Sequence, residues 1–147
     1  VNGNYVTSIM ALQEAMNEGY DEALLLDDEE NISEGSGENF FIVKNKILFT
    51  PDLDASLDGI TRKSIISLAE ELNIKVEIKK IKLQDVLVAD ELFFTGTAAE
   101  VVPIRSVDKK LISNGERGEI TTILQKNYFD QVRGKRNSFS EWLYSID

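Results

Sequence analysis

Apolar residues recur at helical spacing in several stretches of the chain. Tyr5, Ile9, Leu12 and Met16 follow one another at intervals of three or four, which predicts one apolar face of a helix, and Gly19 supplies its end. The same spacing recurs after Thr61 and after residue 120. The predicted helices cover residues 4–18, 61–73 and 120–132, and residues 86–89 add a short helical turn.

Short apolar runs between turn residues predict strands. Residues 40–43 are continuously apolar, which is typical of a strand buried on both faces, and residues 44–46 form a turn into a second apolar run that Pro51 closes. Ile74, Val76 and Ile78 alternate with charged residues, so that strand should have one wet face. The predicted strands cover residues 23–26, 40–43, 47–50, 74–78, 92–95 and 101–104.

Strands interleaved with helices predict a single mixed α/β domain. The length of 147 residues suits one domain with a substantial core, and no internal repeat is present. The glycines at 35, 37, 115 and 118 lack the spacing of a dinucleotide-binding fingerprint, which excludes a Rossmann interpretation. The apolar cluster at residues 142–144 is expected to dock on the body of the domain.

The amino-acid composition excludes several kinds of partner and active site. A net charge of −10 argues against a nucleic-acid partner, and the chain has neither cysteine nor histidine, so thiolates, imidazole bases and the commonest metal ligands are excluded. The acidic run at residues 27–30 is interpreted as a solvated turn and not as a metal site. No signal peptide and no apolar run near 18 residues occurs, so we expect a soluble, cytoplasmic protein without a membrane partner.

The segment Ser-Glu-Gly-Ser-Gly-Glu-Asn at residues 33–39 is the most informative in the chain, because it runs directly into the buried strand at 40–43. Gly35 and Gly37 permit positive φ and let a ligand approach the backbone. Glu34 and Glu38 lie beside the core, where an acid usually has a charged partner. A bulged hairpin carrying two solvated glutamates is the alternative.

Two other segments could present free backbone N–H groups to an anion. Leu57-Asp58-Gly59-Ile60-Thr61-Arg62 opens the second helix, and residues 93–100 end a strand in the small turn Gly-Thr-Ala-Ala-Glu. Ordinary explanations stay open here, since Thr61 could cap its own helix and Leu57 could be a core residue.

Taken together, these three segments resemble the fold-type IV pyridoxal-phosphate enzymes, also called class IV aminotransferases, and most closely their branched-chain amino-acid aminotransferases. The resemblance extends from Asn4-Tyr5 to Trp142-Leu143. It implies the mixed, pseudo-barrel-like sheet of the family's large domain, pyridoxal phosphate as cofactor, and amino transfer between branched-chain amino acids and 2-oxoglutarate.

The resemblance also implies roles around the cofactor ring. Glu34 would pair with the pyridine nitrogen, Tyr5 would hydrogen-bond the phenolic oxygen, and Leu57 would pack on the ring. Glu38 matches a second family acid, without a direct cofactor role, and a buried structural ion pair is its alternative explanation.

On the phosphate side, the resemblance implies a cup at the start of the second helix and in the small turn that ends the strand at 92–95. Phosphate contacts would come from Gly59, Ile60, Thr61 and Thr97, and Ala98 would meet the substrate carboxylate. Glu119 stands where the family often has proline, which leaves the geometry of that loop open.

The family pattern Lys-x-x-Gly-Asn-Tyr places the Schiff-base lysine just before Val1, so no residue of this chain is expected to be that lysine. Residues 1–147 are therefore expected to be the C-terminal large domain alone. It should bind the cofactor weakly or not at all, and it should be inactive without the missing N-terminal domain and homo-oligomeric partners. D-amino-acid aminotransferase and aminodeoxychorismate lyase are alternatives within the family. A non-catalytic anion-binding module is an alternative of another class.

Overall fold

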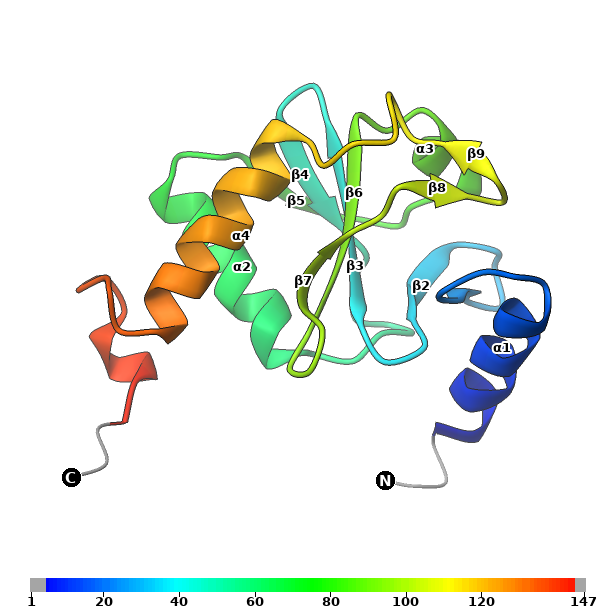
Figure 1. Ribbon diagram of the computed structural model, residues 1–147, viewed down its shortest axis with the longest axis horizontal. Coiled ribbons are helices and arrows are strands. Elements are labelled where there is room, and N and C mark those ends of the chain that lie inside the picture. Colours follow the sequence, from blue (N-terminus) through cyan, green and yellow to red (C-terminus); the bar gives the residue numbers. More distant parts are fainter. Residues whose placement is uncertain (1–4, 145–147) are drawn as a thin grey trace.

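The computed structural model describes residues 5–144 and has a mixed sheet at its centre (Figure 1). The helices are α1 (Val6–Asn17), α2 (Ile60–Glu71), α3 (Leu83–Leu87), α4 (Glu119–Val132) and the short 3-10 helix η2 (Ser140–Trp142). The main strands are β1 (Leu24–Leu26), β2 (Ile32–Gly35), β3 (Asn39–Lys44), β4 (Ile47–Thr50), β5 (Val76–Ile78), β6 (Glu91–Gly96) and β7 (Glu100–Pro103). A small hairpin of β8 (Ser106–Val107) and β9 (Lys110–Leu111) completes the described elements.

Strand β3 lies at the middle of the sheet and pairs antiparallel with β2, β4 and β6. The β4–β5 pair is parallel, because α2 crosses over between these two strands. The prediction of a mixed α/β domain is therefore confirmed. The continuously apolar sequence of β3 is explained as well, since both of its faces are buried.

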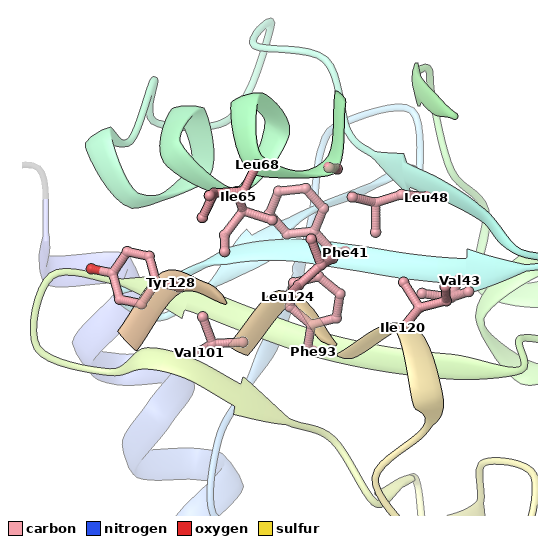
Figure 2. Close-up of a cluster of buried hydrophobic side chains, with 11 residues drawn as sticks. Phe41, Val43, Leu48, Ile65, Leu68, Phe93, Val101, Ile120, Leu124 and Tyr128 are labelled. Atoms are coloured by element: carbon pink, nitrogen blue, oxygen red, sulfur yellow. The ribbon is translucent and has the colours of Figure 1, made fainter. Parts of the chain in front are cut away.

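Alternate residues of β3 enter two separate cores. Phe41 and Val43 face α2 and α4, and the Phe41 ring stacks on Phe93 at 4.9 Å between centroids (Figure 2). On the other face, Phe40 and Ile42 pack against the α3 side of the sheet. Helices α2 and α4 cross each other in contact on this side of the sheet (Figure 1).

Most predicted elements are confirmed, and the differences have local causes. The short helix α3 begins three residues before the predicted turn at 86–89, because Asp85 accepts a hydrogen bond from the Lys82 amide and stabilises an earlier start. Ile78 was expected on the dry face of its strand but is 55 % exposed, since β5 is short and lies at the sheet edge. Strand β2 and the β8–β9 hairpin were not predicted.

The two ends of the described chain are the least buried parts. Helix α1 forms as predicted and ends before Gly19 at φ +85°, yet none of its side chains is buried. At the other end, Trp142 stacks on Phe139, whereas Tyr144 is 92 % exposed, so only part of the predicted tail cluster docks. No helix within residues 5–144 is both long and apolar enough to cross a membrane.

Candidate functional site

The hairpin of β2 and β3 places Glu34 and Asn39 side by side. These residues are directly paired across the two strands, so their side chains leave the same face of the hairpin. Gly35 and Gly37 do not adopt the positive φ that was expected. Gly35 instead relieves crowding, because a Cβ there would lie 3.0 Å from both the Phe94 ring and Glu38 Oε2.

The Glu34 carboxylate is held by backbone and not by a cation. Its Oε2 accepts a hydrogen bond from the Leu57 amide at 2.9 Å, and Asn39 Nδ2 approaches the same oxygen at 3.5 Å. No lysine or arginine of the described chain pairs with Glu34, so the expected charged partner is not among residues 5–144. Burial without a cation raises the pKa of Glu34, despite the opposing Leu57 bond. Oε1 receives no hydrogen bond from residues 5–144.

Glu38 likewise lacks the ion pair that was its alternative explanation. Its Oε2 accepts a bond from the Gly37 amide at 3.1 Å, and the charged groups that act on it are other acids, first Glu22 and then Glu34. Burial, followed by the repulsion of Glu22, raises the pKa of Glu38. Glu22 binds the amides of Ala23 and Ser36, so both acids hold the turn at residues 35–38.

The start of α2 lies next to this hairpin and has no side-chain cap among the residues described. Gly59 is the N-cap residue, so the alternative that Thr61 caps its own helix is wrong. Leu57 is 63 % exposed and Ile60 is 79 % exposed, which excludes core packing as the role of Leu57. The first backbone amides of the helix therefore have no side-chain acceptor within residues 5–144 and lie beside exposed apolar side chains. Such an arrangement favours the binding of an anion.

The turn between β6 and β7 meets the same hairpin. A Cβ on Gly96 would lie 3.2 Å from the Gly37 carbonyl oxygen, so the two turns are in close contact. Thr97 and Ala98 follow in this turn and are exposed. Figure 1 shows this turn, the β2–β3 turn and the start of α2 along the lower edge of the central sheet. The segments that carry Thr61 and Thr97 therefore end at the same edge of the central sheet.

Seven of the eight candidate residues are gathered in these three segments. Tyr5 precedes α1, and no hydrogen bond joins it to the others among the described residues. Two residues with a structural part in the site were missed. Asn39 donates to the Leu57 carbonyl at 2.7 Å, and buried Arg62 donates to Thr50 Oγ1 and the Pro51 carbonyl. Both stood inside the quoted motifs, but only the fold shows what they contact.

Residues 1–107 match the family model "Amino-transferase class IV". The chain belongs to the class IV amino-transferase family. A branched-chain-amino-acid aminotransferase from Pseudomonas aeruginosa is 52 % identical over 141 residues, which cover 96 % of this chain and 46 % of that protein. The enzyme of the same name from Escherichia coli K12 is 42 % identical, over 99 % of this chain and 47 % of its own length.

Solved structures of branched-chain aminotransferases share the fold. The T.th. branched-chain amino acid aminotransferase complexed with N-(5'-phosphopyridoxyl)-L-glutamate superposes with a TM-score of 0.98 at 40 % identity, over all of this chain and 50 % of that one. The Escherichia coli enzyme superposes with a TM-score of 0.95 at 41 % identity, over 99 % of this chain and 48 % of its own. The chain thus spans about half the length of the relatives it matches.

Proposed function

We propose that this chain is the cofactor-binding large domain of a branched-chain amino-acid aminotransferase that uses pyridoxal phosphate. One observation carries the proposal. Glu34, which has one oxygen without a hydrogen bond from the described residues, binds the Leu57 amide just before the helix α2, whose start at Gly59 has no side-chain cap among them. Relatives at 42–52 % identity carry that activity in their names. Their greater length supports a further N-terminal region outside this chain.

The donor set fits the chemistry of this cofactor. A half-buried carboxylate without a cation suits a protonated pyridine nitrogen, since the two opposite charges would stabilise each other. At the other end, the amides of Ile60 and Thr61 suit a phosphate, because a helix start carries partial positive charge. Pyridoxal phosphate needs a lysine for the Schiff base, a partner for the ring nitrogen, anchors for the phosphate and oriented groups around the substrate. The last three have candidates in this chain, and the lysine does not.

Each residue then has one task. Glu34 Oε1 holds the proton on the ring nitrogen, Leu57 packs on the ring, and Tyr5 hydrogen-bonds the phenolic oxygen. Ile60, Thr61 and Thr97 bind the phosphate, Gly59 begins the helix that presents the amides of Ile60 and Thr61, and the amide of Ala98 binds the substrate carboxylate. When bound, pyridoxal phosphate supplies an electron-withdrawing ring that takes up charge from the amino acid. The Schiff-base lysine, an arginine that the resemblance implies for the phosphate, part of the substrate pocket and the homo-oligomeric partner would come from outside this chain.

The test is an assay of the full-length protein. Purified protein should show the visible absorbance of bound pyridoxal phosphate and form glutamate from 2-oxoglutarate with leucine, isoleucine or valine. Glu34→Gln should abolish most of this activity, whereas the exposed control Glu116→Gln should not. Transfer only from D-amino acids, or lyase activity on aminodeoxychorismate, would move the protein to another branch of the family. Phosphate binding without any transfer would contradict the proposal and favour a non-catalytic module.

A further inference from the structure

Asn39 occupies the point where the two ends of the proposed cofactor site meet. Its side chain is almost fully buried, at 6 % exposure, although asparagine is usually a surface residue. Nδ2 donates to the Leu57 carbonyl at 2.7 Å and lies 3.5 Å from Glu34 Oε2. A buried amide persists only where its hydrogen bonds are made, so these contacts explain the residue.

Both backbone polar groups of Leu57 are hydrogen-bonded. Its N–H donates to Glu34 Oε2, and its carbonyl oxygen accepts bonds from Asn39 Nδ2 and from the Gly59 amide at 2.9 Å. Glu34 and Asn39 are themselves paired across the β2–β3 hairpin. The acid, the loop before α2 and the strand therefore form one closed hydrogen-bonded ring.

The other polar atom of Asn39 fits against the helix start. A Cβ added to Gly59 would lie 2.1 Å from Asn39 Oδ1, so a side chain at residue 59 and the present Asn39 cannot coexist. Asn39 thus contacts both the acid and the N-cap of α2. No other side chain in the described part of the chain hydrogen-bonds to both Glu34 and Leu57.

We infer that Asn39 is a positioning residue, which sets the distance between the Glu34 carboxylate and the start of α2, and so between the ring and phosphate ends of the cofactor site. The inference rests on the proposed function. A ligand that spans both ends needs this spacing, whereas a free phosphate needs only the helix start. Loss of Asn39 should therefore lower the affinity for a ligand that spans both ends and leave the affinity for free phosphate unchanged. A change in the spacing between the two ends matters only to a ligand that binds both of them.

The experiment compares two ligands on the full-length protein stripped of cofactor. Asn39→Ala and the near-isosteric Asn39→Asp should weaken pyridoxal phosphate by about tenfold or more, with Asp the worse because its oxygen would face Glu34 and the Leu57 carbonyl. Both should change inorganic phosphate affinity by less than about twofold. The pH dependence of the visible absorbance of the bound cofactor should also shift, since it reports the charge that Glu34 holds on the ring.

Asn31 is the matched control, because it is equally buried and donates to Asp27 in a turn outside the site. Asn31→Ala should lower the melting temperature and leave both affinities unchanged. Gly59→Ala should weaken pyridoxal phosphate much less in the Asn39→Ala background than alone, because the steric conflict with Oδ1 is then removed.

The outcomes separate the inference from the proposed function. If the unaltered protein binds no pyridoxal phosphate, the proposed function falls and the inference falls with it. If it binds, but Asn39→Ala binds within about twofold of it, the inference alone is wrong. Equal loss of pyridoxal phosphate and phosphate would also overturn the inference, because Asn39 would then be needed only for folding.

Discussion

The starts of α2 and α4 are built alike and used differently. Each helix begins after a glycine N-cap that lies over a polar side chain from the central β3–β6 pair. A Cβ on Gly118 would lie 2.0 Å from the Glu91 carboxyl carbon, and one on Gly59 would lie 2.1 Å from Asn39 Oδ1. In both places glycine is required by the close approach of a side chain, since neither residue has positive φ.

The difference is where the negative charge comes from. Glu91 closes the α4 start from within the chain, accepting bonds from the Ile120 and Thr121 amides at 3.0 and 2.7 Å and from the Thr121 hydroxyl at 2.7 Å. At α2 the neutral Asn39 binds the preceding loop instead and leaves the helix amides open. An internal anion makes a helix start structural, whereas a neutral neighbour leaves its partial positive charge for a ligand.

The largest expected effect concerns Glu34, the acid on the open side. In the full-length protein, Glu34→Gln should lower the rate of amino transfer by some tens to several hundredfold, equivalent to about 2 to 4 kcal/mol for a charge-assisted bond in a dry site. Glu38→Gln should cost far less, because Glu38 holds only the Gly37 turn. Steady-state kinetics measure both, and equal, small losses would contradict the assignment of Glu34.

The next effect concerns Glu91 on the closed side. Glu91→Ala should lower the free energy of unfolding by about 3 kcal/mol, because three donors at the start of α4 lose one charged acceptor. Urea denaturation measures the change. Glu119→Ala, which removes an exposed acid from the same helix turn, should cost less than about 1 kcal/mol. A similar loss in both variants would show that general helix electrostatics, and not the cap, stabilises α4.

The starts of α2 and α4 each contain a threonine, Thr61 and Thr121. Thr61 and Thr121 are both buried in the first turns of α2 and α4, but only Thr121 has a hydroxyl bonded to the chain's own carboxylate. Thr121→Val should cost about 1 to 2 kcal/mol of stability and leave the affinity for pyridoxal phosphate unchanged. Thr61→Val should do the reverse, weakening the cofactor about fivefold or more with little change in stability. The reverse assignment of these effects would end the comparison.

The smallest effect is a pH dependence of stability. The pKa of Glu38 is raised in the folded chain, so this carboxyl favours folding while protonated and disfavours it once ionised. Glu38→Gln should therefore become progressively more stable than the unaltered chain as the pH rises above 4.5, the ordinary value. Partial exposure should keep the difference below about 1 kcal/mol.

Glu77 provides a control of opposite sign, because its bond to Lys75 lowers the pKa of that carboxyl. The stability that it contributes is present above pH 4.5 and is lost as the pH falls toward the lowered pKa. Glu77→Gln should accordingly be the less stable protein near neutral pH. A Glu38→Gln difference that does not vary between about pH 4 and pH 7 would show that burial does not control this acid.

The local pattern determined most of the secondary structure. The apolar run of β3, the hairpin turn before β4 and the helical spacing in α2 and α4 depend on neighbouring residues, so a single sequence contains the information. The glycine turn and the Leu-Asp-Gly-Ile-Thr segment likewise identified the family, since their order and spacing are linear features. For α1 the sequence predicted the helix but not the environment of its apolar face, because periodicity shows that a helix has an apolar face but not what covers it.

Only the tertiary structure decided which groups close each helix start. Glu91 and Thr121 are 30 residues apart, and Asn39 and Leu57 are 18 apart, so no local rule connects them. The same is true of Glu34, whose position beside the core suggested a charged partner, whereas its closest bond within the described chain comes from the Leu57 amide. The spacing of motifs along the chain is enough to propose which residues belong to a site. The pairing of β3 with β2 and β6 decides their partners, because it brings distant side chains within hydrogen-bonding distance.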